Sequence, residues 1–212
     1  MACAICRTRR PRRCCPGVRG DICTVCCGTE REVSVECPLD CEYLQQARQH
    51  EKAPPFDSAQ APNQDIRVPE NFFDEHQGLL AFLSITLTQA ALRTPGAVDF
   101  DVREALDALI RTYRTLQSGV YYESRPANPL AAGLCDGVQE ALAAFRRQEP
   151  ERVGRTTIRD ADVLGILIFL QRLELNWNNG RRRGRAFLDF LRGYYAPGPG
   201  APAAPASSLI LP

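Results

Sequence analysis

The sequence has few of the side chains on which acid–base and nucleophilic catalysis most often depend. It contains two histidines, His50 and His76, among 212 residues. Neither stands in a pattern with a catalytic partner, so we expect both to be solvated or to lie at helix ends. No Gly-rich loop is followed by a lysine in the way that a phosphate-binding loop requires. These absences predict a protein that is not an enzyme.

Long apolar runs, a secretory signal and a strong net charge are also absent. The longest apolar run, 163–170, is too short to cross a bilayer. The first residues run directly into arginines, without the apolar stretch of a secretory signal. The formal net charge is only +1, although Lys52 is the sole lysine against 25 arginines. We therefore expect a cytoplasmic protein with no membrane partner.

Cysteine, by contrast, is abundant and concentrated. Nine of the ten cysteines lie between residues 3 and 41. A segment of about forty residues is too small to bury a self-sufficient core, so it needs a covalent or metal crosslink. Two Cys-x2-Cys pairs, at 3/6 and 23/26, direct their thiolates to one point, as tetrahedral zinc requires. Thiols persist in a reducing compartment, which favours zinc over disulfides.

Several assignments of these cysteines to metal ions fit the spacing. Either alternate pairs share an ion or consecutive pairs do, and a single ion with bystander thiols is the third alternative. In the alternate arrangement Cys15 is preferred to Cys14, because Pro16-Gly17 forms a tight turn after it. We prefer two zinc ions in the alternate arrangement, with the predicted ligands Cys3, Cys6, Cys23 and Cys26 for the first and Cys15, Cys27, Cys37 and Cys41 for the second.

The segments 26–31 (Cys-Cys-Gly-Thr-Glu-Arg) and 37–44 (Cys-Pro-Leu-Asp-Cys-Glu-Tyr-Leu) resemble the zinc-motif segment of a group of uncharacterised bacterial proteins. The resemblance extends over about twenty residues and has no assigned activity. More loosely, the Cys-rich stretch is similar to zinc ribbons and treble clefs. The resemblance implies metal binding in a zinc-finger-like module and no particular reaction.

Two arginine-rich segments accompany the cysteines. Residues 7–19 hold six arginines and no acid. A zinc ion with four thiolates carries a charge of about −2, so these arginines either neutralise the metal sites or bind nucleic-acid phosphates. Residues 181–185 follow Trp177 at an expected helix start, where arginine is unfavourable unless an anion is near. The candidate anion or nucleic-acid contacts are Arg9, Arg10, Arg12, Arg13, Arg181, Arg182, Arg183 and Arg185.

Helical periodicity dominates the chain from residue 70 onward. The run 163–170 is apolar on every side and is expected to form a buried central helix. Before residue 70, Asp40 is expected to cap a helix and 33–35 to form a short strand. The pattern predicts helices over about 39–51, 70–93, 101–116, 130–145, 157–178 (starting at Thr157 or Asp160) and 187–191.

Together these features predict a mainly α protein in four parts. They are a ribbon- or treble-clef-like zinc module over 1–51, a Pro-rich linker over 52–69, a bundle of about five helices over 70–195, and a disordered tail over 196–212. The expected function is a zinc-binding interaction or regulatory adaptor with an unidentified protein partner. A nucleic-acid-binding regulator and a thiol-based redox or metal sensor are the alternatives.

Overall fold

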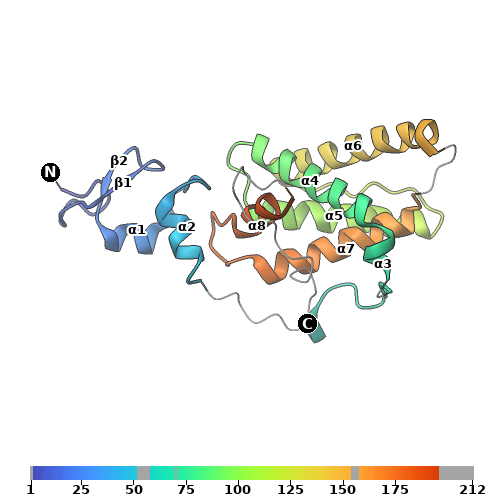
Figure 1. Cartoon of the computed structure of the whole chain (residues 1–212), viewed down its shortest axis with the longest axis horizontal. Coiled ribbons are helices and arrows are strands. Elements are labelled where there is room, and N and C mark those ends of the chain that lie inside the picture. Colours follow the sequence, from blue (N-terminus) through green and yellow to red (C-terminus); the bar gives the residue numbers. More distant parts are fainter. Residues whose placement is uncertain (1, 52–57, 70, 154–157, 196–212) are drawn as a thin grey trace.

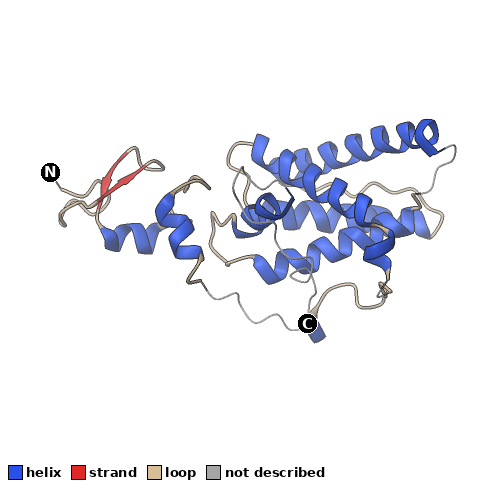
Figure 2. Cartoon of the chain, viewed as in Figure 1, coloured by secondary structure: helices blue, strands red, loops and turns tan. Residues whose placement is uncertain are grey.

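The computed structural model describes residues 2–51, 58–69, 71–153 and 158–195 of the chain (Figure 1). The predicted tail over 196–212 and the first part of the predicted linker lie outside these residues. The described chain is mainly helical, as predicted (Figure 2). Its elements are β1 (Arg13–Cys15), β2 (Gly20–Ile22), α1 (Thr24–Glu30), α2 (Glu42–Arg48), the 3-10 turn Ser58–Gln60, α3 (Phe72–Glu75), α4 (Gln77–Arg93), α5 (Asp99–Gln117), α6 (Pro129–Val153), α7 (Asp160–Trp177) and α8 (Ala186–Tyr195).

Helices α4 to α8 enclose the larger of two apolar cores. Helix α5 packs against α6 and α7, while α4 packs against α6 and α8. Every residue from 162 to 171 of α7 is buried, which confirms the expected central helix. A Cβ at Gly165 would come within 2.7 Å of the Phe72 ring, so the glycine lets α3 pack directly on α7. Removal of this apolar surface from water is the main stabilising contribution to the helical part.

Several helix boundaries differ from the sequence-based expectation. The first predicted helix is divided at His76, whose φ of −116° and ψ of 21° leave the helical region, so α3 and α4 are separate. Helix α5 begins before Asp101, because the Asp101 carboxylate accepts the Val98 N–H at 2.8 Å in the manner of a capping box. Helix α6 continues to Val153, well beyond the predicted end at 145.

The Cys-rich module, residues 2–51, lies at the opposite end of the molecule from α3 (Figure 1). Its small core is made of cysteines together with Ile22, Leu39 and Leu44. Strands β1 and β2 form an antiparallel hairpin in which Arg13 pairs with Ile22. The seven-residue helix α1, which the sequence did not predict, begins directly after Cys23.

The strand predicted for 33–35 is wrong. The N–H groups of Val33 and Val35 both bond to the Glu30 carbonyl oxygen, at 3.1 and 3.0 Å, which closes a tight turn. Glu32, next to this segment, lies in the same turn at a left-handed φ of 52°, and Val35 forms only an isolated bridge with Arg31. The predicted cap is also displaced by one residue, because Cys41 rather than Asp40 is the N-cap of α2.

The described part of the predicted linker is held against the helices. Arg114 in α5 donates to the Asn63 Oδ1 at 2.7 Å and to the Asp65 carboxylate at 2.7 Å. Arg172 in α7 donates to the Asn63 carbonyl oxygen at 2.9 Å. Residues 62–65 therefore lie on α5 and α7 rather than forming a free connection.

Candidate metal centre

Four cysteines from two turns meet at one point. Cys3 and Cys6 lie in an N-terminal turn that the Arg7 N–H closes on the Cys3 carbonyl oxygen at 2.9 Å. Cys23 is the N-cap of α1, and Cys26 lies in the first turn of that helix. The four Sγ atoms all lie within 4.8 Å of one another. This arrangement, which the spacing predicted, has the ligand number and the ligand type of a tetrahedral metal site.

Backbone amides surround these thiols as they surround metal-bound thiolates. The Cys23 N–H donates to the Cys3 Sγ at 3.2 Å, and the Cys26 N–H donates to the Cys23 Sγ at 3.4 Å. A hydrogen bond from the Thr8 hydroxyl lowers the pKa of Cys6 to about 5. Burial, with an addition from the neighbouring Cys23 side chain, raises the pKa of Cys26 to about 12. Cys3, Cys6, Cys23 and Cys26 could hold a divalent cation, which would remove this conflict by stabilising all four thiolates together.

Some arginines of the first basic segment, residues 7–19, contact thiols, and others face solvent. Arg9 is hydrogen-bonded to the Cys23 side chain, and this contact raises the pKa of the guanidinium. Arg13 donates from Nη1 to the Cys27 Sγ at 3.2 Å and lies 4.4 Å from the centre of the Tyr43 ring. Arg10 and Arg12 are exposed, and within the described residues their side chains make no hydrogen bond or ion pair. Arg9 and Arg13 thus fit the neutralising interpretation, whereas Arg10 and Arg12 face solvent.

The remaining predicted ligands surround a second, smaller cavity. Cys15, Cys27, Cys37 and Cys41 line a space of about 20 Å³, together with Arg13 and Arg31. Cys15 is buried and Cys14 is exposed, although both contact this space. Among the described residues, only the Sγ atoms of the first group of four all lie within 4.8 Å of one another. The thiols of the second group are therefore farther apart.

The second basic segment joins the Cys-rich module to the helices. Arg181 donates from Nη1 to the Arg31 carbonyl oxygen at 2.7 Å, and Arg185 donates from Nη2 to the Cys37 carbonyl oxygen at 2.6 Å. Arg183 lies 3.6 Å from the Glu36 carboxylate, while Arg182 is exposed. Arg181 and Arg185 are therefore engaged within the molecule and offer little to an external phosphate.

Glu32 is the residue at this junction that the sequence analysis missed. Its side chain is fully buried, and its carboxylate accepts hydrogen bonds from Arg48 at 2.7 Å and Asn179 at 2.9 Å. The same carboxylate accepts the Arg185 N–H at 3.1 Å, and the Glu32 carbonyl oxygen accepts the Arg183 N–H at 2.7 Å. No local pattern distinguishes this acid from Glu30 or Glu36, because all its partners except Arg48 lie about 150 residues away.

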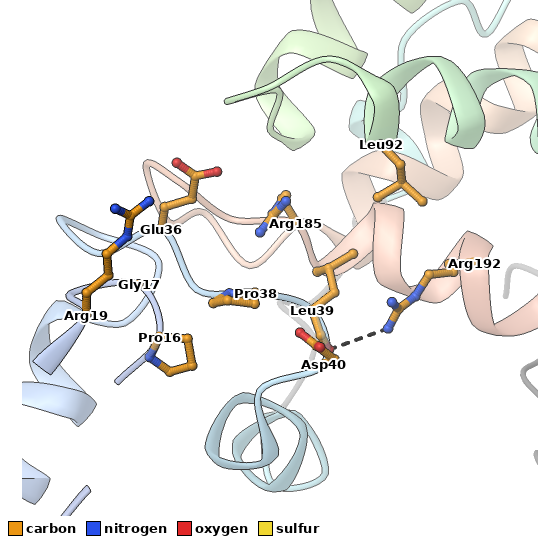
Figure 3. A pocket seen from close by; sticks show the side chains of 10 residues that line it. All are labelled: Pro16, Gly17, Arg19, Glu36, Pro38, Leu39, Asp40, Leu92, Arg185 and Arg192. Atoms are coloured by element: carbon orange, nitrogen blue, oxygen red, sulfur yellow. Dashed lines mark hydrogen bonds between the residues drawn. The ribbon is translucent and has the colours of Figure 1, made fainter. Parts of the chain in front are cut away.

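A groove runs along the junction beside Glu36. It has a volume of about 470 Å³ and lies between the β1–β2 turn, residues 36–40 and helices α4 and α8. A Cβ at Gly17 would overlap the Glu36 carbonyl oxygen, so this glycine permits the close approach that forms one wall. Figure 3 shows Arg19, Arg185 and Arg192 around the groove, with Arg192 bonded to the Leu39 carbonyl oxygen at 3.4 Å.

The tenth cysteine and the two histidines lie outside the two groups of thiols. Cys135 is buried, and its Sγ donates to the Ala105 carbonyl oxygen at 3.4 Å, as expected of a core residue. His50 is exposed. His76 Nε2 lies 3.7 Å from the Asp162 carboxylate, at the junction of α3 and α4.

Compared with known proteins, the chain matches no protein-family model, no curated protein and no solved structure. None of the helices within the described ranges combines the length and the apolar character needed to span a membrane.

Proposed function

We propose that the protein is a cytoplasmic, non-enzymatic, zinc-binding interaction adaptor that carries two zinc ions. The observation that supports this function is the group formed by Cys3, Cys6, Cys23 and Cys26, whose thiols lie within 4.8 Å of one another. Zinc with four sulfur ligands has a closed coordination shell, and its role is then structural rather than catalytic. The metal would replace the large core that a module of this size cannot form.

Metal analysis of the purified full chain tests the zinc assignment. We expect two zinc ions per chain, one of which is lost in Cys3→Ser. Cys14→Ser is the matched control, because the Cys14 thiol is exposed beside the buried Cys15 and its loss should leave the zinc content unchanged. A preparation without stoichiometric metal, whose cysteines form disulfides by mass spectrometry, would overturn the proposal.

The groove at the junction supports the adaptor role and favours an acidic peptide segment as the partner. Arg19 is exposed beside the groove and has no side-chain partner within the described residues, while Leu92 adds an exposed apolar side chain. The groove also holds the Glu36 and Asp40 carboxylates, so a segment that fits it would place an acidic side chain at Arg19 and an apolar one at Leu92. We expect Arg19→Glu to weaken binding of a Glu- and Leu-containing peptide in fluorescence anisotropy, and Arg10→Glu to change it much less. Equal effects of the two variants, or no binding by the wild type, would exclude the groove as the peptide site.

Nucleic-acid binding is the second candidate function. Arg10 and Arg12 favour it, because their guanidinium groups are exposed and have no partner among the described residues. The engagement of Arg9, Arg13, Arg181 and Arg185 within the molecule reduces the cationic surface that remains for phosphates. We therefore rank this function below the adaptor role.

A further inference from the structure

The second group of cysteines comes from four separate parts of the module. Cys15 ends β1, Cys27 lies in α1, Cys37 follows the turn that contains Glu32, and Cys41 caps α2. The cavity between them, about 20 Å³, has room for one ion or one water molecule. Four sulfurs around zinc lie about 2.3 Å from the metal, so these thiols must move closer together than they lie in this structure to bind it.

The charges around this cavity also suit a bound metal. Four thiolates and one zinc ion carry about −2, which nearby cations can offset. Arg13 already donates to the Cys27 Sγ at 3.2 Å. Arg31 lines the cavity, and its Nε is buried without a hydrogen-bond partner. A buried donor without a partner is costly, and a thiolate in this cavity would supply the missing acceptor.

One ligand of this group is bonded directly to the junction with the helices. The Cys37 carbonyl oxygen accepts the Arg185 Nη2 at 2.6 Å. Burial raises the pKa of Cys37, while a hydrogen bond from the Glu32 backbone N–H acts in the opposite direction by favouring the thiolate. The Glu32 carboxylate in turn accepts the Arg185 N–H and the Asn179 side chain. Cys37 is therefore bonded both to the turn that contains Glu32 and to Arg185 before α8.

The first group of cysteines has no such connection. Within the described residues, no hydrogen bond or ion pair joins residues 2–27 to residues 58–195. In the part of the chain that the structure describes, the polar contacts between the Cys-rich module and the helices all come from residues 31–51. Loss of the first group of thiols should therefore leave the junction intact, whereas loss of the second group should disturb it.

We propose that Cys15, Cys27, Cys37 and Cys41 bind a second zinc ion, and that this ion holds the Cys-rich module on the helices through the turn containing Glu32. The inference rests on the proposed zinc-binding function and adds a role for one of its two sites. On binding, each thiol releases its proton to solvent and the sulfur bonds to zinc. Loss of this ion frees the Glu32 turn, so the docking of the module depends on the metal.

Two measurements on the full chain test this linkage. Native mass spectrometry counts the zinc ions, and amide hydrogen exchange follows the Arg183 and Arg185 N–H groups, which both donate to Glu32. Cys27→Ser and Cys41→Ser remove ligands that do not themselves contact Glu32. We expect each to lose one zinc ion and to lower the protection of both amides about tenfold or more, while amides in α7 keep theirs.

Cys3→Ser is the matched variant at the other site. It should also lose one zinc ion but leave the Arg183 and Arg185 amides protected. Unchanged zinc content in both Cys27→Ser and Cys41→Ser would overturn the second site, and loss of zinc without a change in these amides would overturn its link to the junction. A wild-type chain without any zinc would instead contradict the proposed function itself.

Discussion

Glu32 shows how much a single buried charge can contribute when its carboxylate accepts three hydrogen bonds. Its carboxylate bonds to Arg48, to Asn179 and to a backbone amide, all within the junction. Removing one partner of a buried ion pair costs about 3–5 kcal/mol, because the other charge stays buried without compensation. Here Arg48 also contacts Asp189, which keeps part of its charge paired.

We therefore expect Glu32→Ala to destabilise the protein by about 3 kcal/mol in urea unfolding. Glu36→Ala is the control in the same segment, because Glu36 and Arg183 are each about half exposed at 3.6 Å. An exposed pair of this kind contributes about 1 kcal/mol or less. Equal losses in the two variants would show that Glu32 does not fasten the junction.

Asp99 is a second buried acid, and it makes stability depend on pH. Its carboxylate accepts the N–H groups of Phe187 and Leu188 at the start of α8, at 2.9 and 3.2 Å. Burial nevertheless raises its pKa from 3.8 to about 7. As the pH rises from about 4 to about 7, the unfolded chain releases this proton first, so the folded state loses stability.

Comparison with Asp99→Asn isolates this effect, because both proteins share every other titrating group. We expect the stability of the wild type relative to the variant to fall by about 1.4 kcal/mol per pH unit over this range. Urea unfolding at several pH values gives the difference directly. A difference that is constant with pH would mean that Asp99 titrates normally in the folded protein.

At the scale of elements, the Cys-rich module consists of pieces that are too short to be stable alone. Its strands have three residues each and its two helices seven. Isolated helices below about 12 residues are marginal in water, and a two-stranded hairpin is little better. The junction with the helices and, under the proposed function, bound metal would supply the order that these elements lack.

Chelation of the full chain should consequently unfold β1, β2 and α1, while α4 to α8 remain folded around their own core. Circular dichroism should show a small loss of helix, and hydrogen exchange should locate it in residues 2–51. A strong chelator that leaves these residues protected would contradict a metal-dependent module. Loss of protection in α5 and α7 would instead show that the two cores depend on each other.

At the scale of the whole molecule, the arginines are distributed between internal contacts and the surface. Arg9 and Arg13 contact thiols, whereas Arg10 and Arg12 are exposed. With this distribution we expect DNA and RNA binding no tighter than the nonspecific range of about 10⁻⁴ to 10⁻⁶ M at physiological salt.

Fluorescence anisotropy with single-stranded and duplex probes over a salt series measures this affinity. Changing Arg10 and Arg12 to serine should leave the zinc content intact, whereas changing Arg9 and Arg13 should weaken zinc retention. A sub-micromolar affinity that falls steeply with salt and disappears in the Arg10/Arg12 variant would favour the nucleic-acid function instead.

The sequence by itself determined the features that depend on neighbours along the chain. Cys-x2-Cys spacing indicated the group that contains Cys3 and Cys23, because a tight turn brings both thiols of each pair together. Periodicity indicated the helices and the buried run in α7, because a helix repeats its apolar face every 3.6 residues. Helix ends and the turn at Glu32 were missed, since their hydrogen bonds depend on single side chains.

Only the tertiary structure decided how the two parts of the chain meet. It placed Arg181 and Arg185 against the Cys-rich module rather than in solvent, and it buried Glu32 between them. The contacts join residues near 32 to residues near 183, a separation over which local patterns carry no information. Whether a charge is solvated or buried depends on which surfaces come together, and that follows from the packing of the whole chain.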